Sequence, residues 1–211
     1  MSEVASGESA WNKARIEALS DGIFAIAMTL LVLEIKVPDL PRHSSASEVW
    51  RGIGEHGMIF FSFFITFLLS GLFWFWHHVS FHYIRRVDGV ILAINLVFLM
   101  FVSLLPFSTA LLGSFTLGQP VSLAFYFANQ LALSLTLNAH WRYALARGYV
   151  ERTTSPVVER LSAGLFIHPV ACTGSLLMLF VEPRQAFNAF LFVQMFGVVI
   201  ARIVRRRRSK A

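Results

Sequence analysis

An apolar stretch near the start of the chain carries polar side chains that could do chemistry inside a membrane. In residues 15–38, RIEALSDGIFAIAMTLLVLEIKVP, Ser20 and Asp21 precede the run Ile23–Leu33, which is apolar except for Thr29. An ionisable side chain within a membrane span is costly unless it is paired, so by default it marks a functional site. The segment therefore predicts a membrane helix with a role beyond anchoring.

The charged residues at this end of the stretch have two interpretations. Glu17 and Asp21 are one helical turn apart, and Arg15 lies near the entrance of the span. They could form a structural network of ion pairs and hydrogen bonds that fixes this helix against its neighbours, or they could form a proton relay. We favour the structural network.

The same predicted helix gathers apolar residues on one face. At about 100° per residue, the members of this stripe are Gly22, Ile26, Leu30 and Leu33. Thr29 flanks the stripe, whereas Asp21 points away from it, roughly 140° from Ile26. One face could line a narrow path while the acid faces the bundle interior, but packing against lipid or a neighbouring helix explains the same pattern.

Histidines near the end of the second apolar stretch are the other candidates for chemistry. His78 and His82 have the i, i+4 spacing that can chelate a metal. No HExxH motif is present and no carboxylate is adjacent, so we predict no metal site. We expect His77 to pack beside the first helix and to hydrogen-bond its polar end. Asp88 and Asn95, seven residues apart, should share a face of the third span.

Membrane helices must position these residues. Of the 211 residues, 56% are hydrophobic, and the mean hydropathy is +0.63. Six stretches approach the length of about 20 residues that crosses the hydrocarbon core. They are Ile16–Val37, Met58–Ser80, Val90–Leu112, Val121–Trp141, Leu161–Val181 and Ala186–Val204. Because lipid offers no hydrogen-bonding partners, all should be helices, so we predict an all-α membrane protein with six transmembrane helices, the third kinked at Pro106.

The distribution of basic residues predicts the orientation. If the N-terminus lies on one side, that side receives 14 of the 18 Lys and Arg residues. The positive-inside rule then places both termini in the cytoplasm, and this topology explains the net charge of +6 without nucleic acid as a partner. We expect residues 1–14 to be a cytoplasmic segment, 15–204 the six-helix domain, and 205–211 a basic cytoplasmic tail that could attract anionic lipid.

Other protein classes lack support in the sequence. There is no GxSG motif, no phosphate-binding glycine loop and too few histidines for a di-iron box, so we predict neither an enzyme nor a cofactor. The only cysteine, Cys172, can form no intramolecular disulfide and should serve packing. No internal repeat is found, which weakens a transporter interpretation, and no cleaved signal peptide is expected.

Several polar motifs follow one another in order between about residue 12 and residue 204. They are Arg15-x3-Leu19-Ser20-Asp21, Trp74-x2-His77-His78, Asp88, Asn95 and Pro106-Phe107-Ser108-Thr109. The ordered set resembles the transmembrane protein 175 family of potassium channels, which are lysosomal in animals and also occur in bacteria. Leu19 stands where that family usually has Phe, a conservative departure.

The resemblance implies a six-helix subunit that assembles as a homotetramer, with the first helices around a pore for potassium ions. The chain has one such repeat, as bacterial members do. In the family, a ring of Ile or Leu five residues after the motif Asp narrows the pore, and Ile26 occupies that position, with Leu30 and Leu33 continuing its stripe. A hydroxyl residue three positions further on is implicated in potassium preference, and Thr29 occupies it. Ala25 replaces a Ser seen in some members.

We therefore predict a potassium-preferring leak channel in a bacterial plasma membrane, with a hydrophobic constriction at Ile26. Arg15, Ser20 and Asp21 would fasten the pore helix to the second and third spans. Two alternatives stay open. One is a proton-coupled or small-solute transporter that uses Asp21 and the histidines, and the other is a non-conducting membrane scaffold.

Overall fold

The computed structural model describes residues 12–115, 117, 119–150, 158, 161–162 and 164–208, with side chains described up to residue 196. These residues form helices and no β-strand. In chain order the helices are α1 (Lys13–Leu30), the 3-10 turn η1 (Leu31–Glu34), α2 (Ala46–Glu55), α3 (Gly57–Tyr83), α4 (Gly89–Ser103), α5 (Leu105–Ser114), α6 (Pro120–Ala146), α8 (Ile167–Met178) and α9 (Pro183–Arg208). One antiparallel bridge, Ile84 to Val150, joins the segments that follow α3 and α6.

The first helix is shorter than its apolar stretch suggests. Asn12 caps it, since its side chain accepts a hydrogen bond from the backbone N–H of Ala14 at 3.0 Å. The α-helix ends at Leu30, η1 tightens the next turn, and the backbone is extended at Ile35. The sequence analysis predicted a span that continues to Val37. A residue before proline is pushed out of the helical region, so Val37, which precedes Pro38, is disfavoured in a helix.

The third predicted span is a pair of helices, α4 and α5. The break falls at Leu104, immediately before the turn that contains Pro106. Proline has no N–H to donate to the carbonyl four residues earlier, so the expected kink is observed. Gly113 then lets α5 approach α3 closely, because a Cβ at that position would lie 2.6 Å from Ser62 Oγ.

The fifth predicted span, Leu161–Val181, is shorter in the structure. Its helix, α8, has 12 residues, or about 18 Å at 1.5 Å per residue. Pro169 is the third residue of α8, and proline is tolerated in the first turn of a helix but not in its interior. A single helix that began at Leu161 would place Pro169 in its interior, so a start close to Pro169 is favoured. The sixth span corresponds to α9, of 26 residues, which begins at Pro183.

The long connection between the first two spans contains a helix that the sequence analysis did not predict. Ser45 and Glu48 form a reciprocal capping box at the start of α2. The Glu48 carboxylate accepts hydrogen bonds from the backbone N–H of Ser45, foremost, and from its hydroxyl, and both lower the pKa of the carboxyl. A Ser followed three residues later by Glu is a sequence signal for a helix start, and it could have revealed α2.

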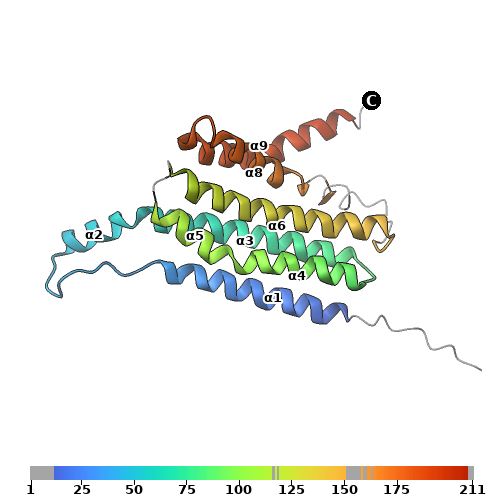
Figure 1. Ribbon diagram of the computed structural model, residues 1–211, viewed down its shortest axis with the longest axis horizontal. Helices are drawn as coiled ribbons and strands as arrows, with labels where there is room; N and C mark the ends of the chain where they lie inside the picture. The colour runs from blue at the N-terminus through green and yellow to red at the C-terminus, as the bar shows by residue number, and fades with distance from the viewer. Residues whose placement is uncertain are drawn as a thin grey trace, which may run out of the picture.

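The helices pack side by side in one bundle. α1 lies along one edge against α3 and α4, while α8 and α9 lie beyond α6 at the opposite edge (Figure 1). The start of α1 and the end of α9 are at the same end of the molecule (Figure 1). One core cluster joins α1, α3, α4 and α6, and a second joins α6, α8 and α9 and includes the buried Cys172.

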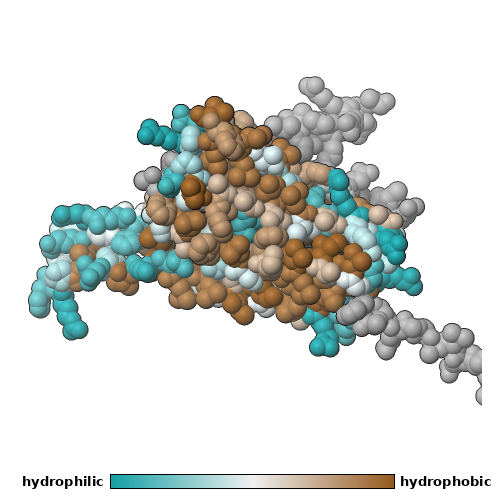
Figure 2. Space-filling model, viewed as in Figure 1, coloured by the Kyte–Doolittle hydropathy of each residue, from teal (hydrophilic) through white to brown (hydrophobic). Residues whose placement is uncertain are grey.

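The surface of the bundle is that of a membrane protein. Figure 2 shows hydrophobic residues over the middle of the visible face and hydrophilic residues at both ends. Four stretches of helix are long and apolar enough to span a bilayer, and they are Lys13–Glu34, Gly57–Tyr83, Gly89–Ser114 and Pro120–Ala146. The protein is a multi-pass, all-helical membrane protein. The count of six spans and the side of the termini stay predictions.

Candidate functional site

Three buried polar side chains connect α1 to α3 and α4. His77 Nε2 of α3 lies 2.8 Å from Asn95 Oδ1 of α4, and Asn95 Nδ2 donates to Ser20 Oγ of α1 at 3.2 Å. Ser20 Oγ donates in turn to the carbonyl of Ile16 at 2.9 Å. Three residues that the sequence analysis singled out are thus joined in one chain of hydrogen bonds across three helices, and His77 reaches the polar end of α1 through Asn95 and not by the direct hydrogen bond that was expected.

The directions of these hydrogen bonds follow from the donors available. Ser20 has one hydroxyl proton, which it donates to Ile16, so it must accept from the amide nitrogen of Asn95. The amide oxygen of Asn95 then faces His77, so Nε2 of His77 must carry a proton. The His77 ring also lies parallel to Phe98, at 3° with centroids 5.3 Å apart. Hydrogen bonding and packing therefore both fix the imidazole.

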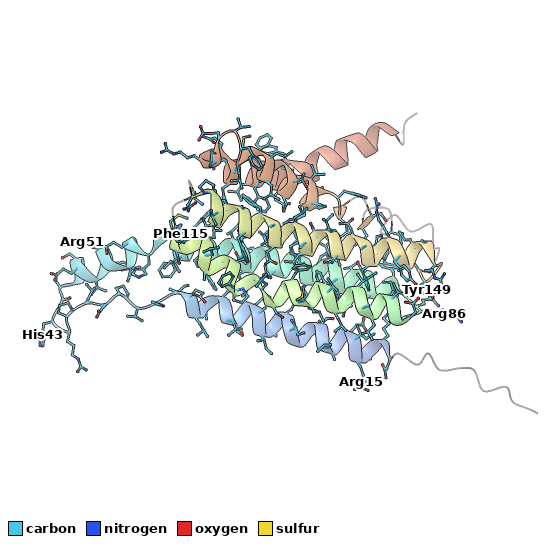
Figure 3. The ribbon with its side chains drawn as sticks, in the orientation of Figure 1. Arg15, His43, Arg51, Arg86, Phe115 and Tyr149 are labelled. Atoms are coloured by element: carbon cyan, nitrogen blue, oxygen red, sulfur yellow. The ribbon has the colours of Figure 1, made fainter. Side chains whose placement is uncertain are left out.

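Asp21 is bonded to α3 and not to Arg15. Its Oδ1 accepts a hydrogen bond from Trp74 Nε1 at 2.8 Å, and the Trp74 ring stacks on His78 with centroids 5.6 Å apart. Arg15 is exposed and points away from the bundle (Figure 3). Among the described residues the Arg15 guanidinium has no hydrogen bond or ion pair, and only its backbone N–H is bonded, to the carbonyl of Asn12 at 3.1 Å. Of the network predicted to fasten this helix to its neighbours, the structure therefore contains the bond of Asp21 to α3, made by an indole N–H that needs an acceptor in apolar surroundings, and within the described chain Arg15 does not take part in it.

Asp88 caps α4 instead of lying on a face of the span. Its Oδ1 accepts from the backbone N–H groups of Val90 and Ile91 at 3.1 and 2.9 Å. Its Oδ2 accepts from the hydroxyls of Tyr143 and Tyr149 at 2.8 and 3.0 Å. Burial raises the pKa of this carboxyl, but the four hydrogen bonds outweigh it and the pKa falls below its usual value. Asp88 thus lies outside the helical face on which the sequence analysis placed it, and it ties α4 to the end of α6.

The opposite face of α1 points away from its own bundle. Ile26, Leu30 and Leu33 are 61%, 42% and 68% exposed, whereas Phe24 on the inner face is 1% exposed. Thr29 is exposed as well, and its hydroxyl donates to the carbonyl of Ile26 at 2.8 Å. The apolar stripe predicted on this helix is therefore unoccupied by any other part of the described chain.

No metal centre is found in the described part of the chain, where no three His, Cys, Asp or Glu side chains lie close enough to hold an ion. His78 stacks on Trp74. Two other histidines, which the sequence analysis did not single out, are buried in the bundle. His140 packs against Phe81 with ring centroids 4.8 Å apart, and His168 hydrogen-bonds Gln194 of α9.

Comparisons with known proteins place this arrangement in a family. The family model described as the endosomal/lysosomal potassium channel TMEM175 matches residues 15–106. A potassium channel of Streptomyces collinus is 34% identical over 64% of this chain and 66% of its own length. A potassium channel of Chamaesiphon minutus is 37% identical over 62% of this chain and 64% of its own length. The chain belongs to the TMEM175 family.

A solved structure supports the same assignment. The crystal structure of a lysosomal potassium-selective channel TMEM175 homolog from Chamaesiphon minutus is 27% identical, with a TM-score of 0.74, over 88% of this chain and 96% of that one. The resemblance predicted from the motifs is thus confirmed, and since the TMEM175 family is one of ion channels, so is the prediction that the protein is no enzyme. The matched region spans about two thirds of the length of the two potassium channels compared above.

The hydrogen bond with Trp74 predicts how much stability a substitution of Asp21 costs. Asp21→Ala removes the acceptor of the Trp74 indole, which is 39% exposed and can find another partner. We expect a destabilisation of about 1 kcal/mol, measured as the thermal unfolding midpoint in detergent. Asp21→Asn keeps an acceptor oxygen and should lose less. If the two variants are destabilised equally, the negative charge of Asp21 matters and its hydrogen bond with Trp74 alone does not explain the effect.

Proposed function

We propose that this TMEM175-family protein is a potassium-preferring cation leak channel formed by four copies of the chain, with the α1 helices around the ion path. The observation that carries the proposal is the exposed apolar stripe of Ile26 and Leu30 on α1 and Leu33 on η1, on the face that the bundle leaves uncovered. A single chain cannot surround an axis with one helix, whereas several copies can.

The hydrogen-bonded chain on the inner face of α1 supports this geometry. Ser20, Asn95 and His77 hold α1 at one rotation about its axis, because each bond requires a particular side chain to face inward. The stripe then faces outward as a consequence. Arg15, Asp21 and Asp88 lie at the same end of the bundle and act through contacts with helix ends or neighbouring copies, not as ion ligands.

In the proposed pore, Ile26 forms the narrowest ring, with Leu30 and Leu33 behind it. An apolar ring cannot replace the water that an ion sheds, so it limits flux by its width and wetting. Thr29 would form a second ring about 4.5 Å along the axis from Ile26. Because its proton is already donated to the carbonyl of Ile26, the lone pairs of its hydroxyl oxygen are free to face a partly dehydrated cation.

Thr29→Ala should remove most of the preference for potassium over sodium while total conductance changes less. The variant keeps the apolar ring but removes the hydroxyl oxygens that offset the lost water. Thr29→Ser, which keeps the hydroxyl, is the matched control and should retain the preference. Reversal potentials under potassium and sodium gradients measure the effect. Unchanged permeability ratios in Thr29→Ala would exclude this residue from the ion path.

The proposed orientation places both termini in the cytoplasm of a bacterial cell, in the plasma membrane. It is supported by the basic residues, since 14 of 18 fall on one side of the proposed spans. Residues 15–204 would be the channel domain, between a short cytoplasmic segment and the basic tail. Residues 1–11 and 209–211 lie outside the described part, as do the side chains of Arg205–Arg208.

Ion flux through the purified protein in liposomes tests the proposal. We expect potassium flux that persists without a proton gradient, together with a mass near four times 23.8 kDa in native mass spectrometry. Flux that requires a proton gradient would favour the coupled transporter. No flux at all would favour the scaffold, and a monomer would contradict a pore built from α1.

A further inference from the structure

A groove between α6 and α8 opens at the edge of the bundle opposite to α1. Its volume is about 590 Å³ and its lining is almost entirely apolar. The residues that matter here are Leu135, Ala139 and Arg142 of α6 and Phe166, Val170 and Gly174 along α8. All six are exposed on the chain surface, so the groove faces whatever surrounds this edge of the bundle in the membrane.

Small residues hollow out the groove. Leu135 and Arg142 are separated along α6 by about 10 Å at 1.5 Å per residue, so the trough runs along the helix axes. Ala139 lies between them on α6. On the wall formed by α8, a Cβ added at Gly174 would meet no atom within 4 Å. The groove is thus long, open and apolar, and its shape fits an extended hydrocarbon chain.

A cationic side chain stands at one end of the trough. The Arg142 guanidinium lies 4.5 Å above the ring of Phe166, and among the described residues no carboxylate pairs with it. Arg142 belongs to the last turns of α6, at the end of the bundle where Figure 3 shows Arg86 and Tyr149. The charge therefore lies near the membrane surface, while the apolar walls extend toward the middle of the bilayer.

We propose that this groove binds an anionic phospholipid, with its phosphate against Arg142 and one acyl chain between α6 and α8. The charge pattern carries the choice of ligand, since a cation at the surface and apolar walls below it match a negative headgroup and its hydrocarbon tail. A water-soluble anion would leave the walls uncovered. The proposal rests on the membrane location of the chain and is independent of the pore along α1.

The bound lipid would brace α6 against α8. Asn138 of α6 already donates to the carbonyl of Leu165 at 2.8 Å, next to the groove, but α8 is short for a spanning helix. An acyl chain along both helices adds apolar contacts on their outer side, where the described protein provides none. The stability of this half of the bundle should therefore depend on the lipid supplied.

Native mass spectrometry of the full-length protein in mild detergent tests the proposal, with phosphatidylglycerol and phosphatidylcholine of equal chain length added in turn. For the wild type we expect one retained lipid per chain, with phosphatidylglycerol preferred. Arg142→Gln should reduce that preference about fivefold while the groove remains. Arg86→Gln removes another exposed arginine at the same end, and as the matched control it should change nothing.

Filling the groove tests the apolar half of the site. Gly174→Leu should abolish retention of both lipids, and Ala139→Phe fills the trough from the other wall if Gly174→Leu does not fold. Retention of lipid by these folded variants would overturn the proposal. So would a preference that survives Arg142→Gln but vanishes when Arg205–Arg208 are replaced by glutamine. A changed oligomeric mass in the filled variants would assign the groove to contacts between copies instead.

Discussion

Ile26→Asn is expected to raise the basal flux of the reconstituted protein on the order of tenfold, which requires a barrier lower by about 1.4 kcal/mol. Ile26 is 61% exposed on the free face of α1. In the proposed ring, an amide offers donors and acceptors to an ion and its water, where the isoleucine offers none. Sodium flux should rise with potassium flux, because the amide has no size preference.

The control for this variant lies on the same helical segment. Val32 is also exposed, at 48%, but it lies in the tighter 3-10 turn η1, so its side chain points roughly 80° away from Ile26 around the helix axis. Val32→Asn should therefore leave ion flux through liposomes unchanged. If Ile26→Asn and Val32→Asn behave alike, or if Ile26→Asn keeps the wild-type current, Ile26 does not line the path.

Asn95→Leu is expected to destabilise the protein by on the order of 3 kcal/mol. Leucine has the same number of side-chain heavy atoms and the same branch point, but it lacks the amide, so the Nε2–H of buried His77 loses its acceptor and Ser20 loses a donor. A buried donor without a partner pays its full desolvation cost. We expect a lower thermal midpoint in detergent and, because the rotation of α1 is no longer fixed, loss of the proposed tetramer.

A double variant separates this cause from a packing defect. His77→Phe combined with Asn95→Leu removes the donor together with its acceptor, and replacement of both partners by apolar groups of similar shape can be nearly neutral. The double variant should recover more than half of the lost stability. If its destabilisation is instead the sum of those of the two single variants, the hydrogen bond between His77 and Asn95 contributes little.

Much of the candidate site could be predicted because its signals are local. Polar residues inside an apolar stretch have to be satisfied by something, which singled out Ser20, Asp21, His77 and Asn95 before any fold was known. The break before Pro106 follows from one missing N–H. The capping box of Ser45 and Glu48 at the start of α2 is an equally local signal, although the sequence analysis did not use it.

Other features depend on how the helices rotate and slide against one another. Asp21 meets Trp74, which lies 53 residues away, and Asp88 meets Tyr143 and Tyr149, 55 and 61 residues away. The positions of these residues along the sequence do not show which side chain each carboxylate will meet. A rotation of α3 by one residue, about 100°, would carry Trp74 away from Asp21.

The sequence alone therefore determined that this is a helical membrane protein, where most of its spans lie, and which polar residues must be satisfied. Those properties follow from apolar length and from the absence of hydrogen-bonding partners in lipid. Only the tertiary structure decided which face of α1 is left uncovered by the bundle. Ser20 and Phe24 lie on the opposite face and are buried against α3 and α4. The apolar stripe alone fits lipid contact and pore lining equally well, and side-chain packing between helices distant in sequence sets which way it points.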